Sequence, residues 1–389
     1  MRLYIRPHNG NFFAMWSMCN SPKWELLEVI DNVLTMNFLK RKNKQTLFRG
    51  AIFSVVAIFL FLACSSEKPS YIKSSGPMLG TFMQVNALAT VEPSELYTMM
   101  MEIDQEAKAS MSLFDEKSLL SRVNRNQTDL VDHHITHCLE LSRRFSKMSD
   151  GSYDVTIAPL VEAYGFAGKD RGAQVNVDSL LEFIGISKVE IKDGRLLKAD
   201  PRVKIDFNSI AKGYVVDMAA ERLEKMGVES YLVDIGGEVR CKGTNDKGGA
   251  WRIGIETPFD GNNTPGAFIQ QVISLSGCSM ATSGNYRRYY IDEQGNKVAH
   301  TIDPKTGRSV VSDLLSATVI APTCAEADAY GTMFMAMGKE RSIALAKELA
   351  REGVMVYFIT AGEGDKFEVY YSAKLAPMLK TTEGFHALR

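Results

Sequence analysis

Hydrophobic residues recur along most of the chain with either helical or strand spacing. Helical spacing predicts helices at 93–110, 132–149, 211–226, 324–337 and 339–352. Alternating or short apolar runs predict strands at 81–87, 204–207, 231–235, 251–256, 272–275, 287–292, 318–321, 354–360 and 367–371. Because strands and helices do not alternate as regular βαβ units, the pattern favours an α+β fold over a doubly wound parallel sheet.

A short apolar stretch near the N-terminus departs from this pattern. Residues 51–63 are apolar except for one serine, follow a basic segment at 40–49 and precede Cys64. This run is short for a membrane span, which needs about 20 residues. A basic segment, a short apolar segment and a small residue before the cut are typical of a secretory signal. The Ala63-Cys64 pair resembles a bacterial lipoprotein signal with lipidation at Cys64, although Phe61 stands where such signals usually carry Leu. An uncleaved anchor helix is the alternative.

The leader divides the chain into four parts. We interpret 1–35 as an upstream extension or a mis-assigned start, with translation beginning at Met36, and 36–63 as the signal peptide. A genuine cytoplasmic extension is the alternative for the first part. Residues 64–75 are predicted to be a lipid-anchored polar tether, and 76–389 a single domain. The domain is therefore expected on the periplasmic side of the bacterial inner membrane.

Composition excludes several classes of protein. The chain is 45% hydrophobic and 23% charged with a net charge of −1, which argues against disorder and coiled coil and gives no electrostatic reason to expect nucleic acid. Four cysteines beyond the leader are scattered singly, without the spacing of a zinc or redox motif, and we predict small buried apolar residues: Cys138, Cys241, Cys278 and Cys324. Three close histidines, at 133, 134 and 137, fall on a predicted polar helix and are interpreted as a solvated face.

Two segments place a carboxylate beside small residues at the start of a predicted turn or helix. In the first, 206–214, Asp206 ends a short strand, and the backbone N–H groups of the following helix start, with Lys212, suit a phosphate or another anion. A capped helix explains the same residues equally well. In the second, 234–238, paired glycines permit close backbone approach to a ligand, or simply a turn.

Two further segments carry candidate catalytic and metal-binding groups. His300 ends a strand before a turn at 303–307, where an imidazole could act as a general base or have a structural role. Asp328 and Thr332 lie four residues apart, hence on one face of a predicted helix. Their oxygens are ligands that Mg²⁺ accepts, although a contact between them at a helix edge is the alternative.

In sequence order these segments resemble the ApbE family of FAD:protein FMN transferases. The resemblance runs from Pro77 to about Tyr371, and no single motif decides it. It includes the segments 78–82, 111–114, 121–124, 151–156, 159–161, 164–166, 206–214, 234–237, 282–288, 300–307 and 327–332. The resemblance implies one ApbE-like domain of mixed, mainly antiparallel sheets with packed helices.

The resemblance also implies the composition of the site. Its FAD-binding positions are Met78, Leu79, Phe114, Ser152, Tyr153, Asp154, Asp206, Lys212 and Ile302. Phe114 stands where the family often has Tyr, which keeps stacking but loses a hydroxyl. Its Mg²⁺ ligands are a main-chain carbonyl at Ser209 and the side chains of Asp328 and Thr332.

The implied reaction transfers FMN from FAD to a threonine hydroxyl of an acceptor protein and releases AMP, with His300 as the candidate base. The implied acceptor is a subunit of a membrane redox pump. Two alternatives stay open: an FAD pyrophosphatase that releases free FMN and AMP, and a non-catalytic flavin-binding lipoprotein. A generic solute-binding lipoprotein is disfavoured because the sequence shows no two-lobed organisation.

Overall fold

The computed structural model describes residues 68–389 apart from 168–175, 263, 265, 365 and 389. The predicted signal peptide and Cys64 lie outside the described residues. Within them, no helix combines the length and the apolar character that crossing a membrane requires.

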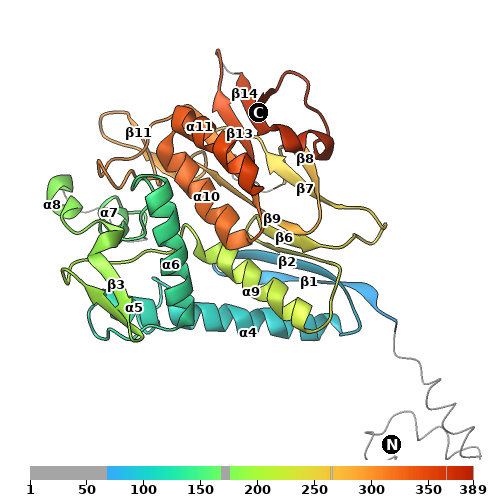
Figure 1. The fold of residues 1–389 in the computed structure, drawn as a ribbon, viewed down its shortest axis with the longest axis horizontal. Coiled ribbons are helices and arrows are strands. Elements are labelled where there is room, and N and C mark those ends of the chain that lie inside the picture. The colour runs from blue at the N-terminus through green and yellow to red at the C-terminus, as the bar shows by residue number, and fades with distance from the viewer. Residues whose placement is uncertain (1–67, 168–175, 263, 265, 365, 389) are drawn as a thin grey trace, which may run out of the picture. The chain divides into compact units, whose positions relative to one another are not determined.

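A nine-stranded sheet forms the centre of the domain (Figure 1). Its order is β1-β2-β5-β6-β9-β12-β13-β14-β15, and every neighbouring pair is antiparallel except the last, β14–β15. The strands are β1 Ser70–Met78, β2 Thr81–Ala89, β5 Tyr231–Ile235, β6 Glu238–Lys242, β9 Cys278–Gly284, β12 Leu314–Ala321, β13 Met355–Ala361, β14 Phe367–Ser372 and β15 His386–Leu388.

Helices cover one face of this sheet. Two of them, α9 (Ala211–Lys225) and α10 (Cys324–Met337), lie side by side across the central strands (Figure 1). Three more pack against these or the sheet: α4 Pro93–Met111, α6 His133–Met148 and α11 Lys339–Leu349. The opposite face packs against a two-stranded sheet made of β7 (Trp251–Glu256) and β8 (Ile269–Leu275).

Side-chain alternation along β13 shows why both faces are covered. Val356 and Phe358 belong to the apolar cluster beneath the helices, whereas Tyr357 and Ile359 belong to the cluster beneath β7 and β8. Successive side chains of a strand point to opposite faces, so this continuous apolar run buries both.

The remaining elements are short helical turns and hairpins. The helical ones are α5 Leu119–Asn124, α7 Ala158–Ala163, α8 Val177–Leu181, η1 Ile186–Lys188, η2 Ala350–Glu352 and η3 Ala373–Met378. The others are two hairpins, β3 Val189–Lys192 with β4 Arg195–Lys198, and β10 Tyr289–Ile291 with β11 Lys297–Ala299.

The α+β class and the mainly antiparallel sheet are confirmed, and the predicted helices all occur. Two details are wrong. Residues 204–207 make only a single bridge, from Lys204 to Ile157, because Asp206 turns its backbone toward Val155 and Asn124 holds the N–H of Ile205. The predicted tether extends too far, since residues 70–75 already form β1, whose pairing with β2 does not require apolar side chains.

The predictions for cysteine and histidine side chains are partly corrected. Cys138, Cys241 and Cys324 are buried as expected, but Cys278 is only half-buried, and β6 and β9 place Cys241 and Cys278 directly opposite each other. His134 is 4% exposed and packs inward, so the solvated face predicted for the three histidines is wrong at this residue.

Candidate functional site

The site is built around the close contact between α9 and α10. The Gly213 N–H, in the first turn of α9, donates to Asp328 Oδ2 on α10 at 3.0 Å. A Cβ on Gly213 would lie 2.2 Å from the carbonyl oxygen of Cys324 and 2.8 Å from Asp328 Cβ. Only glycine therefore permits this helix contact, which fixes Asp328 against the start of α9.

A second carboxylate holds the start of α10 against α9. Both oxygens of Asp217 accept N–H groups, from Cys324 at 2.9 Å and from Ala325 at 2.8 Å. Arg240 on β6 donates to the same carboxylate at 2.7 Å. The carboxylate satisfies two of the free N–H groups that every helix start carries, so the register of the two helices is set by side chains of the domain itself.

Lys212 and Glu238 form an ion pair beside Asp328. Glu238 begins β6, is 3% exposed and has one oxygen, Oε2, buried without a hydrogen-bond partner. Burial raises the pKa of Glu238, and the positive charge of Lys212 opposes that rise. Burial also lowers the pKa of Lys212, but the charges of Glu238 and Asp328 more than reverse this and raise it to about 12. Lys212 is therefore charged at neutral pH.

Three more carboxylates lie in this region: Asp206 and Asp328 are buried, and Asp234 is half-buried. Burial raises the pKa of Asp206, of Asp234 and of Asp328, and the positive charge of Lys212 opposes the rise at the last two. Asp206 accepts the Asn208 N–H at 2.7 Å and Asp234 accepts the Gly237 N–H at 2.9 Å. Each carboxylate closes the turn that follows its strand or bridge. Within the described residues no side chain caps α9 at Ile210, so the helix cap considered for Asp206 is not formed, whereas the turn considered for 234–238 is.

Hydroxyl groups line the same helices. Thr332, one turn after Asp328 on α10, has Oγ1 3.4 Å from Ser283 Oγ on β9. Ser209 lies just before α9, and its Oγ is 2.8 Å from the hydroxyl of Tyr153. Tyr153 itself is buried, which raises the pKa of its hydroxyl and keeps it neutral.

His300 approaches the cluster from the segment after β11. Its Nδ1 lies 3.2 Å from the carbonyl oxygen of Arg288, so Nδ1 carries the proton and Nε2 has the free lone pair. Burial and the nearby charges of Arg288 and Lys212 lower the pKa of His300 to about 4. The imidazole is therefore neutral at pH 7.

Four of the predicted flavin-binding residues differ in what they offer to a ligand. Met78 is buried and Leu79 has a φ of +51°, with its N–H donating to Asp104 Oδ1 at 2.9 Å. Phe114 is 73% exposed, so its ring is available for stacking. Ile302 is a buried core residue packed with Leu160, which leaves its backbone as the part available to a ligand.

Ser152 and Asp154 make mainly internal contacts. Arg341 Nη1 donates to Ser152 Oγ at 2.9 Å. Asp154 accepts bonds from the N–H and hydroxyl of Thr156 at 2.8 and 2.7 Å and from the Ile186 N–H at 2.7 Å. In this conformation the Asp154 carboxylate ties two loops together.

The oxygen donors of Ser209, Asp328 and Thr332 fit a magnesium ion by their chemistry. They offer a main-chain carbonyl, a carboxylate and a hydroxyl, all hard oxygen ligands. Asp328 is 4% exposed, and among the described residues one N–H, that of Gly213, donates to its carboxylate. A buried carboxylate with spare acceptor capacity beside a lysine is suited to a cation bound together with a phosphate.

Sequence reasoning missed the residues that position the site. Glu238, Asp104, Asp217 and Arg341 each bind a predicted site residue or its helix across a long sequence separation. Glu238 lies in a segment that the sequence singled out, but nothing in the sequence pairs it with Lys212. A charged residue at the start of an otherwise buried strand was the available signal.

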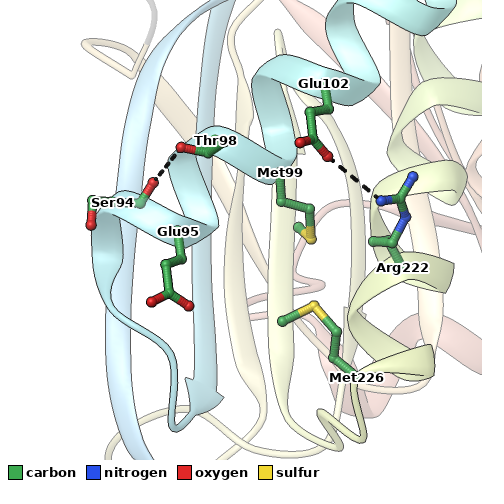
Figure 2. A pocket seen from close by; sticks show the side chains of 7 residues that line it. All are labelled: Ser94, Glu95, Thr98, Met99, Glu102, Arg222 and Met226. Carbon is green, nitrogen blue, oxygen red and sulfur yellow. Dashed lines mark hydrogen bonds and ion pairs between the residues drawn. The ribbon is translucent and has the colours of Figure 1, made fainter.

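A surface hollow lies away from these residues. It has a volume of about 440 Å³ and lies between α4 and α9 (Figure 2). Its lining is Ser94, Glu95, Thr98, Met99, Glu102, Arg222 and Met226, which includes none of the predicted site residues. The figure shows Glu102 and Arg222 meeting across it, 3.8 Å apart. Most of its rim is open to solvent, and it takes no part in the chemistry argued below.

Fold and site together define an α+β protein that groups a lysine, buried carboxylates, hydroxyls and a neutral histidine around two helix starts, an arrangement suited to a phosphate-containing ligand with a divalent cation. The family model of the ApbE family matches residues 79–358, and the chain belongs to this family.

Characterised relatives agree with that placement. An FAD:protein FMN transferase of Vibrio cholerae is 32% identical, covering 85% of this chain and 99% of the relative, and one of Haemophilus influenzae is 35% identical over 78% and 90%. The solved structure of the flavin transferase ApbE from Vibrio cholerae superposes with a TM-score of 0.70 at 31% identity, covering 80% of this chain and 99% of that one. The flavinyl transferase ApbE of Pseudomonas stutzeri gives 0.71 at 27% identity, covering 81% and 98%.

Proposed function

We propose that this chain is an FAD:protein FMN transferase, which moves FMN from FAD to a threonine hydroxyl of an acceptor protein and releases AMP. The observation that carries the proposal is the convergence of four distant segments on one cluster. The charge of Lys212 acts on the pKa values of Glu238, His300 and Asp328, which come from β6, the segment after β11 and α10. Family membership gives this cluster its substrate.

In the reaction, the threonine oxygen forms a bond to the phosphorus of the FMN half of FAD. The bond from that phosphorus to the bridging pyrophosphate oxygen breaks, and AMP leaves with that oxygen. The threonine proton passes to a base. Lys212 is placed to bind the negative pyrophosphate, since its ammonium is charged at neutral pH and 37% of its side chain is exposed.

Magnesium would be held by the Ser209 carbonyl, Asp328 and Thr332. Bound there, Mg²⁺ would supply neutralising charge to the pyrophosphate and its leaving group. The Gly213 N–H orients the Asp328 carboxylate for this role at 3.0 Å. The Lys212–Glu238 pair limits the positive charge of the cluster, so the site can accept both a cation and an anion.

His300 is the candidate base. Its Nδ1–H is bound to the Arg288 carbonyl, which aims the basic Nε2 away from the backbone. Because the imidazole is neutral at pH 7, Nε2 can accept the proton of the attacking threonine. The negative charge of bound FAD opposes the influence of Lys212 and Arg288 and therefore makes the imidazole more basic in the complex.

The flavin end of FAD would lie near the turn after β1. The Leu79 backbone at this turn is held by Asp104, and the exposed ring of Phe114 offers a stacking surface. Tyr153, hydrogen-bonded to Ser209, links this region to the proposed magnesium ligand.

Lipidation at Cys64 would anchor the enzyme on the periplasmic side of the bacterial inner membrane. There it would meet membrane-embedded acceptors, of which a redox-pump subunit is the proposed class. The basic segment, apolar run and small residue before Cys64 support this placement.

The proposal is tested by incubating the purified chain with FAD, Mg²⁺ and a candidate acceptor subunit. Mass spectrometry should find FMN attached to one threonine of the acceptor, with an equal amount of AMP released. AMP and free FMN without labelled acceptor would replace the transferase with an FAD pyrophosphatase. FAD binding without any release of AMP would instead indicate a non-catalytic flavin-binding lipoprotein.

A further inference from the structure

Two imidazoles and a carboxylate meet at the start of α6, where it contacts α4. They belong to Glu106 on α4 and to His133 and His134 in the first turn of α6. One potential ligand atom from each residue lies within 4.8 Å of the others. None of the three belongs to the cluster around Asp328.

The structure already orients His134 as a ligand. Its Nδ1 lies 2.9 Å from the hydroxyl of Tyr214 and its Nε2 lies 3.2 Å from Glu106 Oε1. A tyrosine hydroxyl can donate or accept, so it satisfies Nδ1 in either tautomer and leaves Nε2 for a cation. Such a partner on the far nitrogen is typical of metal-binding histidines.

His133 and Glu106 provide an open side. Both are exposed, whereas His134 is buried, so a cation could enter from solvent and keep water as a further ligand. The rings of His133 and His134 lie 3.8 Å apart at their centroids and are inclined by 38°. One nitrogen of each ring also lies within 4.8 Å of a Glu106 carboxylate oxygen.

The surrounding charges include one that opposes a cation. Arg222 lies 4.0 Å from Glu106 Oε2 and 3.8 Å from Glu102. Its ion pair with Glu102 can therefore persist when Glu106 binds a metal. Asp132 caps α6 through the Ile135 N–H at 3.0 Å and adds negative charge beside the two histidines.

We propose that Glu106, His133 and His134 bind a late first-row divalent cation, with Zn²⁺ as the best match. Two imidazoles with one carboxylate suit zinc, whereas Mg²⁺ prefers oxygen ligands alone. This second site is thus chemically distinct from the proposed magnesium site. It would join α4 to α6 directly and, through Tyr214, fix the first turn of α9 next to Lys212 and Gly213.

The test measures Zn²⁺ binding to the purified chain by calorimetry, with Mg²⁺ in excess. Substitutions His133→Ala and Glu106→Gln, both at exposed positions, should each weaken Zn²⁺ binding by at least about tenfold. Two matched controls should keep wild-type affinity: His137→Ala one turn later on α6, and the distant exposed His386→Ala. Zn²⁺ should also raise the thermal midpoint of the wild type but not of His133→Ala.

Asp328→Asn separates the two sites, because Zn²⁺ binding should survive it unchanged. Loss of binding in Asp328→Asn with retention in His133→Ala would place the zinc at the flavin site and overturn the proposal. Equal loss in His137→Ala would assign the cation to a His133–His137 pair instead. No measurable Zn²⁺ binding by the wild type would also overturn it.

Discussion

Gly213 and Asp328 are 115 residues apart in sequence and are joined by a hydrogen bond of 3.0 Å between the backbone of α9 and the side chain of α10. A single contact thus places a carboxylate at the start of a helix, where a cation and a phosphate could both be bound.

Asp328→Ala is expected to abolish Mg²⁺-dependent release of AMP from FAD, because it removes the only proposed carboxylate ligand of the metal. AMP release is followed by chromatography at saturating Mg²⁺. The control is Glu326→Gln on the same helix. The Glu326 carboxylate lies outside the site and pairs with Arg144 at 2.5 Å. That variant should keep wild-type turnover. Wild-type turnover in Asp328→Ala would remove the metal assignment.

Gly213→Ala should destabilise the domain by roughly 3 kcal/mol, the upper end of the cost of overpacking. The added Cβ would lie 2.2 Å from a backbone oxygen, which cannot move without shifting α10. Denaturant unfolding measures the loss. Gly249→Ala is the matched control, since its Cβ would lie 3.8 Å from Asn245 in ordinary contact and the free energy of unfolding should hardly change. Equal stability of the two variants would contradict the tight helix contact.

Lys212→Met should weaken FAD binding and reduce stability by about 2–3 kcal/mol, below the ~3–5 kcal/mol of a fully buried pair because the lysine is 37% exposed. It leaves the Glu238 carboxylate buried without its partner. The double variant Lys212→Met/Glu238→Gln should recover part of the stability but not the FAD affinity. Failure to recover any stability would show that the two side chains are not coupled.

The same pair predicts a pH dependence. Burial raises the folded-state pKa of Glu238 above its ordinary value of 4.5, so the stability contributed by its proton is complete below 4.5 and is lost as the pH rises through the folded pKa. Removing the positive charge of Lys212 raises that pKa further. Unfolding of Lys212→Met should therefore show a loss of stability that extends to higher pH than in the wild type. Parallel pH profiles would contradict this.

His300 should remain neutral in the free protein from pH 8 to below pH 6, because burial and neighbouring positive charge lower its pKa to about 4. Nuclear magnetic resonance of ¹³C-labelled histidine reports its titration directly, and His300→Gln assigns the signal. This variant should bind FAD normally but transfer FMN much more slowly, by about 10²–10⁴-fold if the base acts as proposed. A titration midpoint of His300 near pH 6.5 would contradict the assignment. So would a weakened affinity for FAD with a normal rate of FMN transfer.

Much of the fold could be predicted because its helices are long and periodic, as α4 and α6 show. Strand β9 was missed because its residues, Cys278–Gly284, are mostly small and are buried by tertiary contacts with the neighbouring strands and α10. The strand predicted at 204–207 fails because a short alternation of charged and apolar residues can also be held as a loop, here by Asn124.

For the site, the reactive side chains could be predicted from the sequence, but their ion-pair and hydrogen-bond partners could not. Asp328 and Thr332 were found from helical spacing and His300 from its place before a turn. The pairing of Lys212 with Glu238 depends on how β6 lies against α9, and that is a tertiary relationship with no local pattern. The same holds for Tyr214, whose hydroxyl meets His134 across 80 residues of sequence.

The early start of β1 bears on how far the enzyme could work from a membrane. Ser70 is already paired with Ala89 in the sheet, so only residues 65–69 separate it from Cys64. Fully extended, that stretch spans at most about 20 Å. A lipid on Cys64 would therefore keep the domain within roughly its own radius of the bilayer. Acceptor threonines would have to be presented close to the membrane plane, and an acceptor projecting far into the periplasm would be out of reach.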